Sequence, residues 1–298
     1  MSETAQARLL RAVLQWLRPF LLLLSLSLAG APVFASGTTH SRVVTLSPHL
    51  AELMVTIGAL DHLVGVSAYS NFPAAVAELP RIGDAFAIDW ERLSLLEPDL
   101  VLAWESGTPT RTVTELKRRG FNVETVRTRS LDDIAAAVQL LGRLTGREAD
   151  ADRQAREFQR KVETLRAAYA ERSSLKVFYQ IAKRPLYTVS GEHFASELIA
   201  LCGGTNVFAD LGELAPLVSV EAVLERRPEV MIAGATAVTP DPFVDWRRWE
   251  GLPANDFDNF FVVDADRLAR PTTRLVDAGK ALCERLDEGR RNRQAAQR

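Results

Sequence analysis

The sequence has little of what enzymes use for metal-dependent or nucleophilic chemistry. Only four histidines occur, and no two of them stand at metal-ligand spacing on one helix. A G-x-S-x-G nucleophile motif and a glycine-rich phosphate loop are both missing. The sequence therefore predicts no catalytic residue, no metal site and no cofactor, and it favours a binding protein over an exported enzyme.

Charge and hydropathy exclude two further classes. Lys and Arg number 36 against 38 Asp and Glu, for a formal net charge of −2. Nucleic-acid affinity comes largely from an excess of Lys and Arg, so we expect no nucleic-acid partner. Beyond the N-terminal region, no apolar run approaches the ~20 residues that a bilayer requires.

The N-terminal region has the layout of a secretory signal. Arg8, Arg11 and Arg18 precede a mostly apolar stretch at 20–28, and small residues flank Phe34 before the expected cleavage site. We predict a signal peptide over 1–35, cleaved after Ala35, and export to the periplasm. An uncleaved membrane anchor is the less favoured alternative, because the apolar stretch is short.

Cysteine is nearly absent, with Cys202 and Cys283 the only two. An even number of cysteines in an oxidising compartment favours a disulfide between them. Two buried free thiols are the alternative. No cysteine lies near the cleavage site, which argues against a lipid anchor.

Strand and helix patterns alternate along most of the chain. Strands are expected at 42–47, 63–66, 100–104, 122–126 and 176–181, with helices at 50–57, 89–96 and 110–119 between them, which predicts parallel α/β sheets. Residues 149–172 form one long amphipathic helix. We expect a signal peptide at 1–35, an N-terminal α/β lobe at 36–147, an interlobe helix at 148–173, a C-terminal α/β lobe at 174–288 and a frayed tail at 289–298.

The two predicted lobes repeat each other. Glu52 stands six residues before Gly58, as Glu197 does before Gly203. Glu91 precedes Pro98 by seven residues, as Glu221 precedes Pro228, and an apolar strand follows each proline. Two matches in the same order indicate two related, Rossmann-like lobes.

Ligands of parallel α/β sheets bind beyond the carboxyl ends of the strands, so two such lobes place a cleft between them. Core packing is the alternative for any one aromatic residue, and a solvated loop histidine is the favoured interpretation of His49. The candidate ligand-binding residues are Pro48, His49, Tyr69, Phe86, Trp104, Tyr187 and Trp246.

Several segments resemble the periplasmic cobalamin-binding proteins of the iron-siderophore/cobalamin class. They are Val43–Pro48, Gly65–Ser70, Pro98–Trp104 and Leu201–Asn206, together with Cys283. The resemblance implies a monomer whose lobes are bridged by a rigid helix, a Cys202–Cys283 disulfide, and delivery of cobalamin or a related corrinoid to the permease of an ABC importer. It also implies that Glu91 and Glu221 dock onto arginines of the permease.

The pocket departs from that family at four positions. Ala85, Thr125, Ile181 and Ala215 stand where the family presents aromatic rings, so haem or a ferric siderophore remains an alternative ligand. A siderophore would require cations in the cleft, for which Arg184, Arg270 and Arg274 are the candidates. A ligand sensor on the same scaffold is a further alternative to import.

Overall fold

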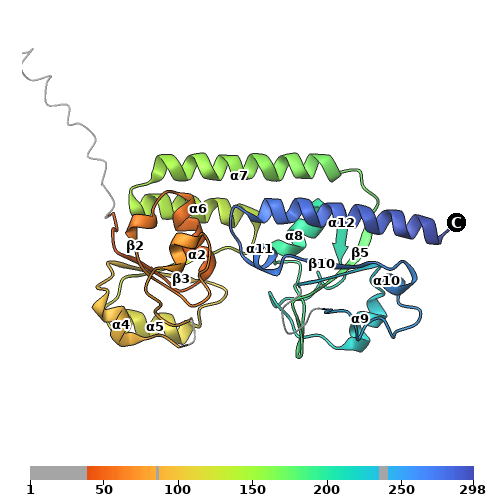
Figure 1. The fold of residues 1–298 in the computed structure, drawn as a ribbon, viewed down its shortest axis with the longest axis horizontal. Helices are drawn as coiled ribbons and strands as arrows, with labels where there is room; N and C mark the ends of the chain where they lie inside the picture. Colours follow the sequence, from red (N-terminus) through yellow and green to blue (C-terminus); the bar gives the residue numbers. More distant parts are fainter. Residues whose placement is uncertain (1–38, 85–86, 235–240) are drawn as a thin grey trace, which may run out of the picture. The chain divides into compact units, whose positions relative to one another are not determined.

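The computed structural model describes residues 39–84, 87–234 and 241–298, which belong to one compact unit. The predicted signal peptide and Phe86 lie outside the described residues. The described part forms two α/β lobes, each built on a four-stranded parallel sheet (Figure 1). The predicted fold class is confirmed.

The N-terminal lobe contains four strands and the helices between them. Its elements are β1 (Val43–Thr45), α2 (Pro48–Thr56), the 3₁₀ helix η1 (Leu60–His62), β2 (Leu63–Val66), α3 (Ala74–Ala77), α4 (Trp90–Leu95), β3 (Leu100–Trp104), α5 (Thr110–Arg118), β4 (Val123–Val126) and α6 (Leu131–Thr145). The strand order is β2-β1-β3-β4.

The C-terminal lobe follows the same plan after the long helix α7 (Glu148–Tyr169). Its elements are β5 (Leu175–Gln180), the hairpin strands β6 (Ala182–Lys183) and β7 (Leu186–Tyr187), α8 (Phe194–Leu201), β8 (Gly204–Asn206), α9 (Val220–Arg226), β9 (Val230–Gly234), α10 (Pro253–Asp256), β10 (Phe260–Val263), α11 (Ala265–Ala269) and α12 (Leu275–Ala296). The strand order is β10-β9-β5-β8. When β5, β8, β9 and β10 are matched in turn to β1, β2, β3 and β4, the two orders are identical.

The repeat predicted from the sequence is therefore present in the fold. Gly58 and Gly203 end α2 and α8, and both adopt a left-handed backbone, with φ of 74° and 71°. The helices α4 and α9 each start at a residue whose side chain accepts a backbone N–H, Asp89 for α4 and Ser219 for α9. Equivalent residues thus start and stop equivalent helices in the two lobes.

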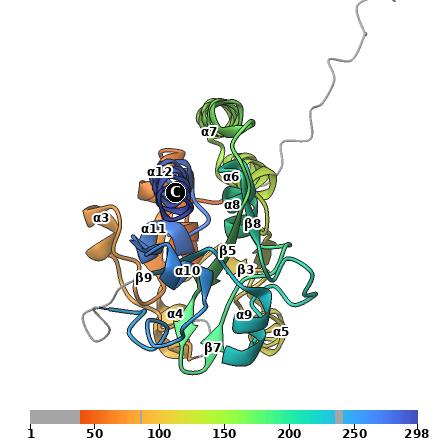
Figure 2. The ribbon, with the colours of Figure 1, turned by 90° about the vertical axis from the view of Figure 1, so that its right-hand side faces the viewer.

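The helices α6 and α7 join the lobes. Ser130 and Asp133 form a reciprocal capping box at the start of α6, and Gly146 ends it in a left-handed conformation. Along α7, an apolar stripe that includes Phe158, Val162 and Leu165 is buried. This helix packs on α6 of the first lobe and on α8 and α12 of the second, and Figures 1 and 2 show it along the top of both lobes.

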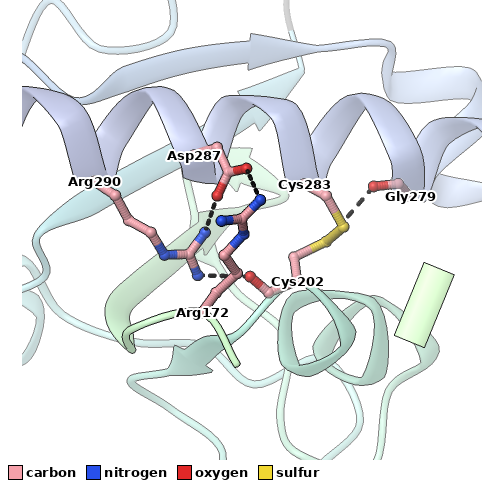
Figure 3. The surroundings of a disulfide bond; sticks show 6 residues. All are labelled: Arg172, Cys202, Gly279, Cys283, Asp287 and Arg290. Atoms are coloured by element: carbon pink, nitrogen blue, oxygen red, sulfur yellow. Dashed lines mark hydrogen bonds and ion pairs between the residues drawn. A yellow bond between two sulfur atoms is a disulfide. The ribbon is translucent and has the colours of Figure 1, made fainter. Parts of the chain in front are cut away.

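The predicted disulfide is present between Cys202, which ends α8, and Cys283 in α12 (Figure 3). The bond closes a loop across 81 residues of sequence. On the chain-entropy model, such a loop stabilises the fold by about 4 kcal/mol.

The tail does not fray as expected, since α12 continues to Ala296. Arg290 is buried and donates to the carbonyl oxygen of Cys202 and to the Asp287 carboxylate (Figure 3). It also donates to the carbonyl oxygen of Ser173. Arg293 binds Glu229 at 3.0 Å. Arg290 and Arg293 thus hold the end of α12 on the C-terminal lobe. No helix among residues 39–84, 87–234 and 241–298 is long and apolar enough to cross a membrane.

Candidate functional site

The carboxyl ends of the two sheets meet across the boundary between the lobes. On one flank, Arg270 follows β10 and α11 and donates to the carbonyl oxygen of Tyr69, which follows β2. On the other flank, Leu131 follows β4 and donates its backbone N–H to the Glu197 carboxylate of α8 at 2.7 Å. These two lines of interlobe contact flank the region where the sequence predicts a ligand cleft.

His49 and Trp104 lie at the middle of the carboxyl edge of the N-terminal lobe's sheet. Pro48 starts α2 and orients its first turn, and His49 follows it, 2% exposed. The His49 Nδ1 atom lies 2.7 Å from the Ser47 hydroxyl, and its ring meets the Trp104 ring edge-on at 4.9 Å between centroids. Burial, and secondarily the positive charge of Arg270, lower the pKa of His49 to about 3. His49 is a buried helical residue, so its interpretation as a solvated loop histidine is wrong.

Four buried polar atoms along this edge have no hydrogen-bond partner within the described part of the chain. They are Thr45 Oγ1, His49 Nε2, Trp104 Nε1 and Thr128 Oγ1. Thr45 and Trp104 end β1 and β3, and Thr128 follows β4. Buried polar groups usually find partners, so four unpaired ones at one sheet edge mark a place that can bond polar groups of a ligand or solvent.

Gly107 explains how Trp104 lies at the end of β3. A side chain at position 107 would meet the indole ring at about 2.0 Å, so only glycine allows the backbone to pass beneath it. The indole is partly buried and packs against the main core. The sequence pattern Trp-Glu-Ser-Gly was a clue to this arrangement that the prediction did not use.

Exposed apolar side chains gather where strands end on both lobes. Tyr69 is 79% exposed after β2 and has a left-handed backbone with φ of 64°, and Phe72 follows on the same loop. On the other lobe, Ile181 follows β5, and Tyr187 pairs with Leu217 in an isolated bridge. Exposed apolar surface on a soluble lobe is typical of a binding site, so these residues suit the faces of a large apolar ligand.

A cavity of about 740 Å³ lies on the flank next to β4 and β8. Residues of both lobes line it, including Arg127 and Arg129 from the first and Glu192 and His193 from the second. Arg129 binds Glu105 at 2.8 Å and approaches Glu192 at 3.8 Å. Burial lowers the pKa of His193 to about 4, which leaves this histidine neutral at physiological pH.

The structure places Trp246 away from the aromatic residues of the first lobe. It is 4% exposed, packs on Phe178, and donates its indole N–H to Gln180 at 2.8 Å. It lines a pocket of about 250 Å³ that is formed by residues of the C-terminal lobe alone. Burial of the ring and bonding of its N–H place Trp246 in the core of the C-terminal lobe, and its contact with a ligand stays a prediction.

Glu91 and Glu221 occupy equivalent and exposed positions. Each is the second residue of a short helix, α4 or α9, whose start is capped by the preceding side chain. Figures 1 and 2 place both helices at the end of the molecule opposite α7. Leu95 follows Glu91 by one helical turn and is also largely exposed. Two exposed acidic residues on one end of the protein can meet one positively charged partner surface together.

One buried charge cluster was missed from the sequence. Glu52, in α2, is 4% exposed and binds Arg270 at 2.7 Å and Arg274 through Nε at 3.1 Å. The repeat had singled out Glu52, and the two arginines had been named only as possible siderophore ligands. In the structure both already have a carboxylate partner, whereas Arg184 is exposed and pairs with Asp245. No group of His, Cys, Asp and Glu within the described ranges could hold a metal ion.

The fold and the site define a two-lobed α/β protein that binds a ligand between its lobes. The chain belongs to the periplasmic binding protein family, whose model matches residues 43–266. A vitamin B12-binding protein of Vibrio cholerae is 35% identical over 246 residues, 82% of this chain and 88% of that protein. One of Vibrio parahaemolyticus is 33% identical over 270 residues, 90% and 95% of the two chains.

Solved structures are similar as well. The crystal structure of the periplasmic vitamin B12-binding protein of Vibrio cholerae has a TM-score of 0.77 and 34% identity, covering 84% of this chain and 98% of that one. A periplasmic haem-binding protein from Roseiflexus has a TM-score of 0.73 at 20% identity, covering 85% and 100%. The latter likeness shows the shared fold alone.

Proposed function

We propose that this protein captures cobalamin or a closely related corrinoid in the periplasm and delivers it to the permease of an ABC importer. The observation that carries the proposal is similarity at 33–35% identity, over four-fifths of the chain or more, to proteins named for vitamin B12 binding. It is a transport binding protein rather than an enzyme, as its family indicates.

The geometry supports a large ligand with an apolar ring and polar substituents. Tyr69 and Tyr187 offer aromatic surface on opposite lobes, and the unpaired His49 and Trp104 nitrogens offer bonds beneath it. Pro48 shapes the turn that carries His49. This arrangement supports ligand contacts of Pro48, His49, Tyr69, Trp104 and Tyr187, while a contact of Phe86, which lies outside the described residues, stays a prediction from the sequence.

A corrinoid is favoured over the alternatives. The similar haem-binding structures are about 20% identical, well below the vitamin B12-binding relatives. A ferric siderophore would need free cations in the cleft, but Arg270 and Arg274 are engaged by Glu52. Neither haem nor siderophore therefore has a specific feature in its favour.

Titration calorimetry of the mature protein, residues 36–298, tests the choice of ligand. We expect saturable one-to-one binding of cyanocobalamin at submicromolar Kd, and no comparable heat from haem or a ferric siderophore. Binding of haem or siderophore instead, with none of cobalamin, would overturn the ligand and retain the transport class. Mass spectrometry of the exported protein tests cleavage after Ala35.

Docking is the second part of the proposal. Glu91 and Glu221, at one end of the molecule, are proposed to bind arginines of the permease. The double variant Glu91→Arg/Glu221→Arg is expected to bind cobalamin normally and to lose import. The control Glu163→Arg/Glu284→Arg makes the same charge change on α7 and α12, and should import normally. Import by the first variant would refute the docking assignment.

A further inference from the structure

Glu52 and Glu197 are equivalent in the repeat, and each crosses from its own lobe to the other. Glu197, in α8, accepts the backbone N–H of Leu131 at the start of α6. Glu52, in α2, meets Arg274, the residue that precedes α12, and Arg270 before it. Since α6 and α12 are themselves equivalent, the two carboxylates make the same kind of interlobe contact on opposite flanks.

The contact of Glu52 has an additional layer that the contact of Glu197 lacks. Arg270 also donates to the Asn71 side-chain oxygen at 2.8 Å and to the Tyr69 carbonyl oxygen at 3.2 Å. The Arg274 guanidinium lies 3.6 Å from the centre of the Phe72 ring. The two arginines that Glu52 binds are thus the groups that grip the loop 69–72.

The conformation of the loop 69–72 requires stabilising contacts from outside the loop. Tyr69 is a non-glycine residue with φ of 64°, a conformation that side chains other than glycine adopt at a cost. Its ring is largely exposed and gains little from packing. The hydrogen bond from Arg270 to its carbonyl oxygen therefore contributes directly to keeping the residue in this conformation.

The charges explain why the arginines depend on Glu52. The side chains of Arg270 and Arg274 are 12% and 25% exposed, and the Glu52 side chain is 3% exposed. Asp266 also approaches Arg270 at 3.3 Å, but it is mostly exposed and therefore screened by water. Without Glu52, two partly buried guanidinium groups would repel each other with only a solvated carboxylate nearby.

We propose that Glu52 is a positioning residue for ligand capture: through Arg270 and Arg274 it holds the loop 69–72, and so presents Tyr69 at the edge of the cleft. Glu52 itself is buried and acts only through the two arginines. The part of this inference that concerns the loop stands on the contacts alone, and the part that concerns cobalamin rests on the proposed function.

Hydrogen exchange of the ligand-free protein tests the first part. In Glu52→Gln, backbone amides of residues 68–72 should exchange about tenfold faster, the equivalent of losing one hydrogen bond to a charged group. In Glu197→Gln, faster exchange should appear at the start of α6 and not in this loop. Leu286→Ala, a buried C-lobe substitution, serves as the control for general destabilisation.

Asn71→Ala provides a milder variant in case Glu52→Gln does not fold. Asn71 is exposed, so its loss removes one Arg270 contact and leaves the buried cluster intact. A rise of about threefold in loop exchange is expected. Unchanged exchange of residues 68–72 in Asn71→Ala, and in Glu52→Gln where it folds, overturns the proposal.

Cobalamin titration then tests the second part. The Kd should rise about tenfold in Glu52→Gln and about threefold in Asn71→Ala, while Leu286→Ala retains the wild-type Kd. Unchanged Kd with a loosened loop would refute the role in capture. If the wild type binds no cobalamin, the proposed function fails, and the exchange experiment still decides whether Glu52 holds the loop.

Discussion

The two lobes share one strand order but use their polar and aromatic residues in different ways. The buried polar atoms without a partner in the described part of the chain all belong to the N-terminal lobe. In the C-terminal lobe, Trp246 donates to Gln180, and Asn206 bonds both Val189 and Ser196. In the N-terminal lobe, polar groups at the sheet edge are left free to bond a ligand or water. In the C-terminal lobe, the corresponding polar groups bond one another.

The lobes are also held together differently. Ile57 and Cys202 occupy the same position of the repeat, immediately before the left-handed Gly58 and Gly203. Ile57 is fully buried among apolar side chains, while Cys202 is bonded to Cys283. At this position of the repeat, packing of Ile57 secures the end of α2, whereas a covalent bond secures α8 to α12, so a repeated fold does not need a repeated means of stabilisation.

The largest effect should come from breaking that covalent bond. The double variant Cys202→Ala/Cys283→Ala should lose about 4 kcal/mol of unfolding free energy, because the unfolded chain is no longer restricted. Thermal unfolding should fall by roughly 10 °C for a chain of this size. In contrast, Ile57→Val in the first lobe should cost about 1 kcal/mol.

The proposed difference between the two lobes would be contradicted if the cysteine variant and Ile57→Val had the same free energy of unfolding. The disulfide would then contribute no more than ordinary packing. Denaturant unfolding of both variants and the wild type, with and without reductant, provides the measurement. Reductant should lower the stability of the wild type and leave the cysteine variant unchanged.

A smaller effect is expected from acid, and both lobes contribute to it. His49 and His193 have pKa values lowered to about 3 and about 4, chiefly by burial. In the unfolded chain they bind protons below pH ~6.5, whereas in the folded protein they stay neutral. Stability from each histidine is therefore complete above pH 6.5 and is lost as the pH falls, by about 2 kcal/mol at pH 5.

Single variants separate the two lobes in this experiment. His193→Asn keeps a side chain that can cap α8 as His193 does, and His49→Asn keeps a polar atom near Ser47. Each should flatten the fall in unfolding free energy between pH 7 and pH 5 by about 2 kcal/mol. A wild-type slope in either variant would show that the corresponding histidine is not held neutral.

Much of the fold could be predicted because local patterns and the repeat agreed. The strand expected at 100–104 is matched by β3, and the long helix expected at 149–172 is matched by α7. Partners far apart in sequence were harder to predict. Arg290 appeared to be a tail residue, since nothing in its neighbourhood indicates the carbonyl oxygens of Ser173 and Cys202 that bind it.

The same limit applied to the site. Tyr69 and Trp104 could be named because each follows an apolar strand, and strand ends of a parallel sheet lie at one edge. Glu52 was visible as a repeated residue, but its partners Arg270 and Arg274 lie more than 200 positions later. Trp246 could not be assigned to core or cleft, because only packing distinguishes a buried aromatic residue from one that meets a ligand.

The smallest effect compares the two tryptophans directly. Trp246→Phe removes the donor to the buried Gln180 oxygen, so we expect it to lose about 2 kcal/mol of stability and to leave cobalamin affinity within twofold. Trp104→Phe removes an N–H that bonds nothing within the described part of the chain, so its stability loss should be about 1 kcal/mol. Its cobalamin affinity should fall about tenfold.

Calorimetric titration and denaturant unfolding of the two variants measure both quantities. If Trp246→Phe weakens cobalamin binding more than Trp104→Phe does, the aromatic core of the C-terminal lobe contacts the ligand. The sheet edges of the two lobes are then more alike than their hydrogen bonds indicate. If Trp104→Phe instead loses stability without affinity, its N–H serves an internal water, because a buried donor that contributes to stability must have a partner. The polar groups at the sheet edge of the N-terminal lobe would then stabilise the fold rather than bind a ligand.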